Sequence, residues 1–454
     1  MSVAAGEATF RCPSRYNRRV NVLVTGSGGR EHAFVDVLSR SAGIGRLVAA
    51  PGNAGIAAQA EVADVPADDV ARQVALARDV RADLVVVGPE APLVAGLVDA
   101  LGRAGIPALG PSRAAAHIEG SKAYMKELCR RARIPTAGCR SFTSSPEAIA
   151  YAETHDRWPT VVKADGLAAG KGVVIAPDAR AAVAAVRAMM LDKAFGEAGS
   201  RVLFEDFLEG EELSVMALVD GETVAVLEPS RDHKAALDGD KGPNTGGMGA
   251  FSPSRLLTRR TYEQIEERVL IPVVHAMARE GRPFRGILYA GLMLCADGPM
   301  VLEFNARGGD PETEVLLPRL ESDALALFHA TATGALSGVD PIRWRPEHAC
   351  GVVLADGAYP GRVVPGKRIY GVDAAAARPG VRVYHMGTAL RDGHLVTAGG
   401  RVLCVVGLGA DLPAARETAY AAVSEIRFDG MRHRTDIGWR ELPRAAGEAV
   451  ARAP

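Results

Sequence analysis

Apolar strands that alternate with helical segments between residues 20 and 115 constrain this fold more than any other feature of the sequence. Three segments, VNVLVTG from Val20, GRLVAAP from Gly45 and LVVVG from Leu84, are apolar over most of their length, which predicts strands buried on both faces. Helical segments between them predict a doubly wound parallel sheet. Ligands of such sheets bind at the carboxyl ends of the strands. The loops at those ends span residues 26–31, 51–55 and 88–92.

The rest of the 454 residues predicts further domains after a polar leader, residues 1–19, which we expect to be disordered. The pattern of residues 142–207 predicts two strands connected by a turn, with helices on either side. Beyond Gly210 we expect antiparallel strands, a long polar loop at 231–249 and a helix near 263–280. From about residue 344 the pattern predicts a small α+β module. The fold class is therefore α/β combined with α+β.

Composition excludes several classes of function. Lys and Arg number 53 against 54 Asp and Glu, so the net charge of −1 provides no field to attract nucleic acid or an acidic membrane. No apolar stretch reaches the ~20 residues that cross a bilayer, and no secretory signal is visible. The six cysteines include no C-x-x-C pair, which argues against a zinc site or a disulfide framework. We expect a cytoplasmic protein that acts on small molecules.

The first glycine loop begins like the dinucleotide fingerprint G-x-G-x-x-G, but Glu31 replaces its third glycine. The second strand ends in Pro51-Gly52-Asn53, without the acid that would bind a ribose, which disfavours NAD. A helix N-terminus with exposed amides beside the Arg30 guanidinium predicts a phosphate site. The alternative is a tight strand–helix turn with a solvated Arg30.

The second glycine loop, Gly166-Leu-Ala-Ala-Gly170-Lys171-Gly172, is one residue short of a Walker A motif and lacks its Ser or Thr. The β-branched residues that follow predict a strand, so this loop connects two strands. Such a loop can close over phosphates as a flap, with Lys171 at its tip and Lys163 on the preceding strand to neutralise a triphosphate. A mobile surface hairpin with solvated lysines is the alternative.

Strand alternation places Glu303, Asn305 and Arg307 on one face of the segment VLEFNAR. Carboxylate and amide oxygens suit Mg²⁺, and an arginine can stabilise an oxyanion or an acyl phosphate. The alternative is an ordinary solvent face of a strand. The long polar loop adds Asp232-His233-Lys234, in which an ordinary hydrogen-bonded role for His233 competes with a catalytic one.

Together these segments resemble the ATP-grasp ligases, and most closely the phosphoribosylamine–glycine ligase family of purine synthesis, from Val20 to Arg440. The resemblance implies an ATP-grasp fold. Its four parts would be a phosphoribosylamine-binding domain over 20–120, an ATP-grasp domain over 121–342 with a lid at about 139–207, a C-terminal domain over 343–445 and a tail at 446–454. The motifs that carry the resemblance are GSGGREHA, APGNAG, VVGPEAPLV, EGSKAYMK, VVKADGLAAGKGV, FLEGEELS, DHK, GPNTGGMGA, YAGLM, EFNAR, GDPET and GGRVLCV.

The resemblance also implies a reaction. ATP would phosphorylate the carboxylate of glycine, and the amine of 5-phosphoribosylamine would attack the acyl phosphate to give glycinamide ribonucleotide, ADP and phosphate. Arg307 and Lys171 would be catalytic, and Glu303 and Asn305 would bind Mg²⁺, with Mn²⁺ as an alternative. The residues implied to contact ATP are Lys122, Lys163, Gly166, Gly170, Gly172, Glu205, Phe207, Leu208 and Glu212. Those implied to contact phosphoribosylamine are Gly28, Gly29, Arg30, Glu31, Asn53 and Glu90, and those for the amino acid are Asp232, Asn244, Gly309 and Asp310.

Two departures from the family pattern lie beside the implied amino-acid site. Gly308 stands where the family has Phe, which predicts a roomier pocket, and Glu314 stands where it has Gln. The charge of Glu314 favours a cationic substrate or a pair with Arg319. A paralogue that uses another amino acid or ribosyl amine in specialised metabolism is therefore an alternative, and an inactive nucleotide-binding protein is another. We expect a monomer or a weak homodimer.

Overall fold

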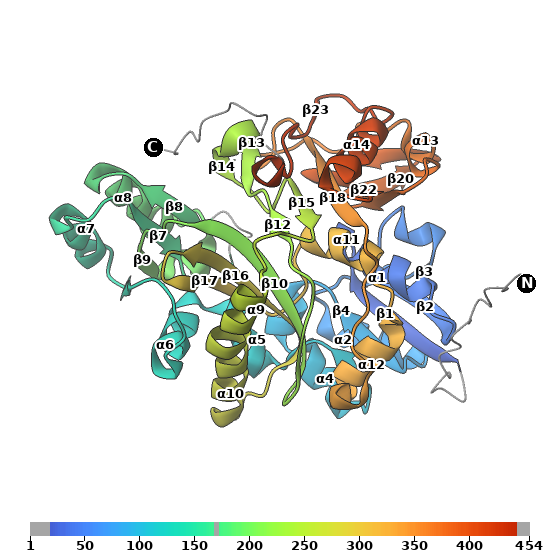
Figure 1. Cartoon of the computed structure of the whole chain (residues 1–454), viewed down its shortest axis with the longest axis horizontal. Helices are drawn as coiled ribbons and strands as arrows, with labels where there is room; N and C mark the ends of the chain where they lie inside the picture. Colours follow the sequence, from blue (N-terminus) through green and yellow to red (C-terminus); the bar gives the residue numbers. More distant parts are fainter. Residues whose placement is uncertain (1–18, 168–171, 443–454) are drawn as a thin grey trace, which may run out of the picture.

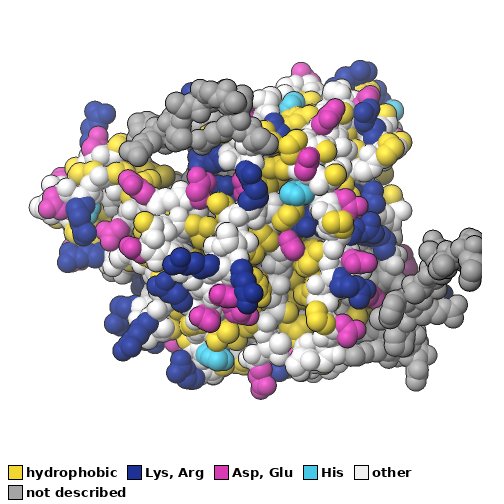
Figure 2. Space-filling view, in the orientation of Figure 1, with side chains coloured by type: hydrophobic (Ala, Val, Ile, Leu, Met, Phe, Trp, Pro, Cys, Tyr) yellow, Lys and Arg dark blue, Asp and Glu magenta, His cyan; other side chains and the backbone are white. Residues whose placement is uncertain are grey.

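The computed structural model describes residues 19–167 and 172–442 (Figure 1). The predicted leader, apart from Arg19, and the predicted tail lie outside the described residues, as do Gly170 and Lys171. Charged side chains of both signs are interspersed over the face shown in Figure 2, which agrees with the net charge of −1. No helix within the described ranges is long and apolar enough to cross a membrane.

The N-terminal part is a parallel sheet in the order β3-β2-β1-β4-β5, which confirms the prediction from the buried strands. Its strands are β1 (Val20–Gly26), β2 (Ile44–Pro51), β3 (Glu61–Val62), β4 (Leu84–Val87) and β5 (Ala108–Leu109). Its helices are α1 (Gly29–Ser39), α2 (Val70–Asp79), α3 (Glu90–Ala95), α4 (Leu97–Arg103) and α5 (Arg113–Gly120). The carboxyl ends of β1, β2 and β4 bring the three predicted loops to one edge.

Helix α6 (Lys122–Ala132) leads into a part that projects to the left in Figure 1. Its antiparallel sheet has the order β6-β9-β7-β8, and β7 pairs with β8 so that Lys163 is opposite Val173. The second glycine loop therefore connects two strands, as predicted. The elements are β6 (Cys139–Phe142), α7 (Ser145–Thr154), β7 (Thr160–Ala164), β8 (Val173–Ala176), α8 (Ala179–Val186) and β9 (Val202–Asp206).

The central sheet, in the order β11-β10-β16-β17, packs against the N-terminal sheet. Leu23 and Val85 share one hydrophobic core with Leu213 and Leu288. A Cβ on Gly286, whose φ is +124°, would lie 2.9 Å from the Cα of Gly110, so this close approach requires glycine. The elements are β10 (Glu211–Asp220), β11 (Val224–Val226), α9 (Arg259–Ile265), α10 (Ile271–Arg279), β16 (Arg285–Cys295), β17 (Gly298–Asn305), α11 (Glu312–Leu316) and α12 (Ala324–Thr333).

The C-terminal part is the predicted α+β module, in which α14 covers β18 and β22. Its core contains Val352, Val405 and Ala419. Its elements are β18 (His348–Asp356), α13 (Val372–Ala376), β19 (Val381–His385), β20 (Thr388–Arg391), β21 (His394–Thr397), β22 (Arg401–Gly409), α14 (Leu412–Val423) and β23 (Met431–Arg432).

The segment predicted as a long polar loop at 231–249 forms strands instead. These are β12 (Arg231–Asp232), β13 (Ala235–Leu237), β14 (Lys241–Asn244) and β15 (Gly249–Ser252). β15 is antiparallel to β18, with Phe251 opposite Cys350, so the C-terminal sheet has the order β12-β15-β18-β22-β19. The prediction was wrong because the backbone groups of this polar segment pair with one another, β13 with β14 and β12 with β15, and β15 also pairs with a strand about a hundred residues later in the chain.

Candidate active site

Glu303 and Asn305 lie two residues apart at the end of β17, as the alternation predicted. Gly291 on β16 is opposite Glu303, and a Cβ there would lie 3.1 Å from the Glu303 Cγ. Burial opposes ionisation of Glu303, but the cations of Lys234, Lys163 and Lys122 outweigh it and hold the pKa of Glu303 below its usual value. Glu303 is therefore an ionised carboxylate surrounded by lysines.

This donor set fits a hard cation that is shared with a polyphosphate. Among the residues that the structure describes, no three His, Cys, Asp or Glu side chains form a group that could enclose a metal ion. A cation held by Glu303 and the Asn305 amide would therefore take further oxygens from phosphate groups and water, which is how Mg²⁺ binds in many nucleotide sites. The carboxylate–amide pair thus suits a magnesium nucleotide better than a free ion.

Two of the predicted ATP contacts, Lys122 and Lys163, lie beside Glu303. The Lys122 ammonium, at the start of α6, donates to the carbonyl oxygen of Gly166 at 2.9 Å. Burial lowers the pKa of Lys122, although the Glu303 carboxylate opposes this change. Lys163 donates to the carbonyl oxygen of Leu302 at 3.3 Å. The second glycine loop and β17 therefore face each other across these lysines.

Glu205, which was predicted to contact ATP, has its side chain directed at the lysines. Its Oε2 accepts from Lys163 at 2.9 Å and forms an ion pair with Lys126 at 2.8 Å, and the residue is 3% exposed. Its side chain therefore orients two ammonium groups. Phe207 and Leu208 lie in the connection between β9 and β10. The site prediction missed Lys126, although its spacing of four residues from Lys122 on a helix was a signal.

Lys234 is a second residue that the site prediction missed. Its ammonium donates to Glu212 Oε2 at 2.8 Å and lies 4.0 Å from Asp232 Oδ1. Lys234 is the main cause of the lowered pKa of Glu212. Burial, reinforced by the carboxylates of Glu312, Glu212 and Glu303, raises the pKa of Asp232 to about 7 against the effect of Lys234. The DHK motif therefore contributes both an acid and a cation to the Glu303 cluster.

Arg307 joins the end of β17 to the N-terminal part. Its Nη2 lies 2.9 Å from Glu119 Oε1, at the end of α5, and its Nε lies 3.4 Å from Glu90 Oε2, at the start of α3. Burial opposes the charge of Arg307, but Glu119 and Glu90 outweigh burial and raise its pKa. Glu119 also accepts from the backbone N–H of Ala306 at 2.7 Å. This glutamate, the first residue of the EGSK motif, was absent from the predicted site.

The first glycine loop differs from both interpretations of the sequence. Arg30 is 6% exposed, its Nε lies 2.6 Å from Glu31 Oε1, and its Nη1 donates to the Gly308 carbonyl at 3.1 Å. The N–H of Gly28 donates to Glu31 Oε2 at 2.6 Å. Glu31 thus caps its own helix and occupies an amide that was expected to be exposed. Arg30 is neither solvated nor open to a phosphate, because it links α1 to the residue after Arg307.

Asn53 also has a role that the sequence did not predict. Its amide nitrogen donates to the carbonyl oxygens of Ser27 and His385, each at 2.8 Å. Its Oδ1 accepts from the N–H groups of Gly55 and Ile56, each at 2.9 Å. An asparagine side chain has two donors and two acceptor sites, so none remains for a ligand. Asn53 therefore joins the N-terminal and C-terminal parts, and its side chain does not support the expected contact with phosphoribosylamine.

The surroundings of Gly308 do not support a roomier pocket. A Cβ at this position would lie 2.6 Å from Thr313 Oγ1 and 3.4 Å from both Phe34 Cζ and Arg30 Cδ. The volume that a larger residue would need is therefore already filled. The prediction was wrong because the sequence does not show which residues of α1 pack against position 308.

Two further residues of the predicted amino-acid site, Gly309 and Asp310, lie in the turn between β17 and α11. Gly309 donates from its N–H to Met216 Sδ at 3.3 Å, and Asp310 Oδ1 lies 2.9 Å from Arg401 Nη1. Asn244 ends β14, opposite Ala235. The predicted pair between Glu314 and Arg319 is absent, because the Arg319 guanidinium donates to Ser252 Oγ at 2.8 Å and to the Glu347 carbonyl at 2.6 Å.

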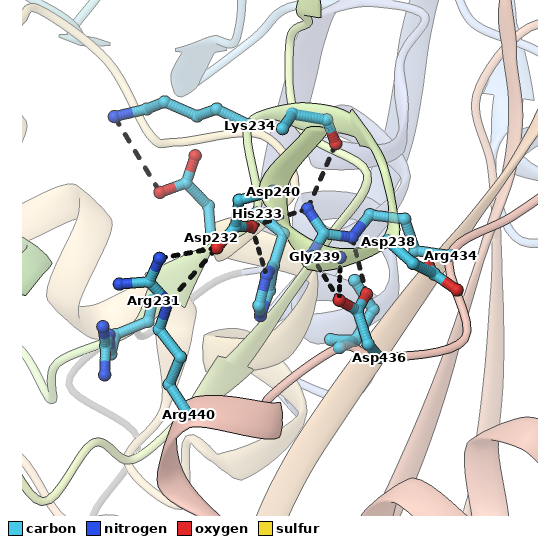
Figure 3. A network of polar contacts seen from close by, with 12 residues as sticks. Arg231, Asp232, His233, Lys234, Asp238, Gly239, Asp240, Arg434, Asp436 and Arg440 are labelled. Carbon is cyan, nitrogen blue, oxygen red and sulfur yellow. Dashed lines mark hydrogen bonds and ion pairs between the residues drawn. The ribbon is translucent and has the colours of Figure 1, made fainter. Parts of the chain in front are cut away.

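A buried polar network anchors the DHK motif to the end of the C-terminal part (Figure 3). His233 Nε2 accepts from the N–H of Gly438 at 2.8 Å, and burial lowers the pKa of this histidine. Arg434, which is fully buried, lies 2.9 Å from Asp240 Oδ1 and donates to both carboxylate oxygens of Asp436 at 2.7 and 2.8 Å. His233 thus has the ordinary hydrogen-bonded role that the sequence left open.

We expect Arg434→Met to lower the free energy of unfolding by about 3 kcal/mol, because it leaves Asp240 and Asp436 without their buried cation. Urea denaturation followed by fluorescence measures this change. Arg343→Met is the matched control, since Arg343 is exposed and pairs only with Glu321 in the salt bridges described. Equal losses in the two variants would contradict a stabilising role for the buried network.

A central sheet that carries a carboxylate–amide pair beside a lysine on an antiparallel β-hairpin is typical of an ATP-grasp enzyme. The comparisons specify the family. The chain matches the phosphoribosylglycinamide synthetase N domain at residues 20–119, the ATP-grasp (A) domain at 120–313 and the C domain at 349–440. The chain therefore belongs to the phosphoribosylglycinamide synthetase family.

Curated relatives agree with this assignment. The chain is 50% identical to the phosphoribosylamine–glycine ligase of Caulobacter vibrioides over 93% of this chain and 99% of the relative. It is 47% identical to that of Pseudomonas aeruginosa over 95% and 100%. A crystal structure of the Thermotoga maritima phosphoribosylamine–glycine ligase superimposes with a TM-score of 0.80 at 32% identity, covering 92% of this chain and 100% of that one. The biotin carboxylase domain of a Hydrogenobacter thermophilus enzyme shares the fold, with a TM-score of 0.71 at 19% identity.

Proposed function

We propose that the protein joins glycine to 5-phosphoribosylamine at the expense of ATP. A carboxylate oxygen of glycine bonds to the γ-phosphorus of ATP as the bond to the bridging oxygen of ADP breaks. The amine nitrogen of phosphoribosylamine then bonds to the acyl carbon, phosphate leaves, and the amine releases a proton. The products are glycinamide ribonucleotide, ADP and phosphate, as a step of purine synthesis.

The position of Arg307 is the main support for this proposal. Arg307 lies two residues beyond Asn305, yet its guanidinium contacts Glu90 at the carboxyl edge of the N-terminal sheet. An acyl phosphate formed beside Glu303 must meet an amine that is bound at another domain. A guanidinium at the junction can stabilise the charge that develops on the phosphate and acyl oxygens, because it is rigid, planar and always protonated.

The same geometry suggests roles for the groups around the nucleotide. Glu303 and Asn305 would hold Mg²⁺, or Mn²⁺, which when bound would neutralise phosphate charge. Lys122 and Lys163 would contact phosphate oxygens, Phe207 and Leu208 the adenine, and Glu212 the ribose. Glu205 would act by orienting Lys163 and Lys126. Gly28, Gly29 and Glu90 would line the phosphoribosylamine site, at the carboxyl ends of β1 and β4.

Glycine is the acceptor acid that the packing favours. Thr313, Phe34 and Arg30 fill the space beside Gly308, so this departure from the family pattern does not create a larger pocket. A paralogue with another amino acid therefore gains no support from position 308. We further infer that the enzyme acts in the cytoplasm on small molecules alone, as a monomer or weak homodimer. The net charge of −1, together with the mixed charges on the face shown in Figure 2, gives no basis for binding nucleic acid.

The test is ADP formation with a panel of amino acids and with phosphoribosylamine generated in situ, combined with mass spectrometry of the product. We expect turnover with glycine that requires both Mg²⁺ and phosphoribosylamine. Alanine and serine should give less than about a tenth of that rate, because the departure at Gly308 does not enlarge the site. Turnover with a larger amino acid but not with glycine would overturn the proposal. ADP formation without any amino acid would also contradict it.

A further inference from the structure

Glu314 is a buried carboxyl group whose oxygens meet no hydrogen-bond donor among the described residues. It lies on α11, it is 0% exposed, and neither of its oxygens has a partner within the described residues. Its side chain faces the N-terminus of α1, where a Cβ on Gly29 would lie 2.5 Å from Glu314 Oε1. Glu314 therefore lies directly beneath the first glycine loop. Its place in the fold is the junction of the N-terminal, central and C-terminal parts.

The Asp310 carboxylate is the group beside Glu314 that could accept a hydrogen bond from it. Asp310 lies beside it, and Asp310 Oδ1 forms an ion pair with Arg401 but has no hydrogen-bond partner in the part of the chain described. Arg401 donates to the carbonyl oxygens of Gly246 and Asp310, at 2.9 and 3.0 Å. Arg401 thus holds the Asp310 turn, while the second carboxyl group, that of Glu314, remains without a cation of its own.

The other ionisable groups on the elements packed against α11 have partners of their own or are neutral. Asp36 on α1 accepts from the Tyr384 hydroxyl at 3.1 Å, Asp356 on β18 lies 2.6 Å from Lys367 Nζ, and burial lowers the pKa of His348 on β18. On α1, Arg30 and Glu31 bond to each other, and burial lowers the pKa of His32 to about 3. Arg319 bonds to Ser252 and to the Glu347 carbonyl. Burial raises the pKa of Cys350, on β18, to about 12, and that of Cys404, on β22, well above its usual value. β15 has no ionisable side chain.

An ionised carboxylate in these surroundings would be costly, because it would lack both water and a partner. Burial, together with the neighbouring Asp310 carboxylate, raises the pKa of Glu314 well above its usual value. A neutral carboxyl group has one O–H donor. The free acceptor beside it is the Asp310 carboxylate, whose Oδ2 lies 3.6 Å from the Cβ position of Gly28.

We propose that Glu314 is a positioning residue that keeps a proton and donates it in a hydrogen bond to Asp310, which holds the Asp310 carboxylate against the first glycine loop. The proposal rests on the proposed function, in which that loop lines the phosphoribosylamine site. Loss of the proton places two negative charges in one buried site. The carboxylates then separate, Asp310 moves from the loop, and phosphoribosylamine binds less tightly at alkaline pH.

Three variants separate this role from simple packing. Glu314→Gln keeps a donor towards Asp310 and cannot ionise, whereas Glu314→Met keeps the volume and has no donor. Glu347→Gln is the matched control, because Glu347 also has a buried carboxylate oxygen without a partner among the described residues, but it faces Arg319. Each variant is compared with the unmodified protein at the same pH, so that ionisation of the substrate amine affects both rates equally and does not change their ratio.

We expect Glu314→Met to raise KM for phosphoribosylamine by about tenfold at neutral pH, with a smaller change in kcat. For Glu314→Gln, the ratio of kcat/KM to that of the unmodified protein should rise as the pH increases above neutrality, because only the unmodified protein can lose the proton. Glu347→Gln should give a flat ratio. A flat ratio for Glu314→Gln in an active enzyme would overturn the proposal, whereas inactivity of the unmodified protein would overturn the proposed function instead.

A second measurement needs no substrate. Because its pKa is raised in the folded protein, Glu314 binds a proton that the unfolded chain has already lost, so its contribution to stability falls as pH rises above the unfolded value. The melting temperature of Glu314→Gln relative to the unmodified protein should therefore increase between about pH 5 and pH 9. A difference that is independent of pH would mean that Glu314 carries no proton, and would overturn the proposal.

Discussion

Replacing Arg307 by lysine is expected to lower kcat for ADP formation with glycine and phosphoribosylamine by about a thousandfold. The substitution keeps a positive charge but replaces a planar fork by a single ammonium. The guanidinium reaches Glu119, Glu90 and the Gly308 carbonyl simultaneously. A lysine cannot hold these contacts and also face an acyl phosphate. The affinity for MgATP should change by less than about threefold, since the phosphates contact other groups.

Steady-state kinetics and calorimetric titration of the nucleotide measure the two quantities. Arg343→Lys provides the control, because this arginine is exposed and far along the chain from the site motifs. Should Arg307→Lys retain more than about a tenth of the activity, a positive charge alone would suffice, and the role in stabilising the transition state would be wrong. A fall in MgATP affinity that matched the fall in kcat would assign Arg307 to nucleotide binding instead.

Replacing Glu303 by glutamine should lower kcat at least about a hundredfold and raise the Mg²⁺ concentration that gives half-maximal turnover. The amide keeps the shape of the side chain and one oxygen, but it removes the charge. Lys122, Lys163 and Lys234 would then face one another without the carboxylate that balances them. The magnesium requirement is measured by titrating Mg²⁺ at fixed ATP.

The control for Glu303 is Glu321→Gln, which removes an exposed carboxylate paired with Arg343. Its activity and its Mg²⁺ requirement should equal those of the unmodified protein. Retention of an unchanged Mg²⁺ titration by Glu303→Gln would show that the metal is held elsewhere. Weak recovery of activity by Mn²⁺, which binds nitrogen and oxygen donors more tightly than Mg²⁺, would support the assignment.

The sequence correctly predicted those parts of the molecule whose structure is determined by residues close together in the chain. Consecutive apolar residues in Leu84–Val87 require burial on both faces, and the structure places this strand inside the parallel sheet. β-branched residues after Gly172 predicted a strand, and β8 is there. Alternation put Glu303 and Asn305 on one face of β17. Each inference used residues within one element or its immediate neighbours.

The parts that were missed depend on partners far away in the chain. Arg30 was expected to face a ligand, but it contacts Gly308, 278 residues later. The side chain of Asn53 is fully occupied by groups that include the carbonyl of His385. The buried Arg434 pairs with Asp240, although neither residue belongs to a recognisable motif. A polar residue in a loop gives no local sign of whether water, a ligand or a distant backbone group will satisfy it.

The pairing of β15 with β18 has a consequence for the order in which the chain can fold during synthesis. When residues 249–252 leave the ribosome, the strand that contains Cys350 has not been made, so the edge of β15 that faces β18 is still unpaired. The N-terminal sheet and the central sheet can close earlier, because all their strands precede residue 306. The DHK motif gains its anchors at Arg434 and Gly438 only when translation is nearly complete. A nascent chain halted before that point would expose the edge of β15 to chaperones or to aggregation.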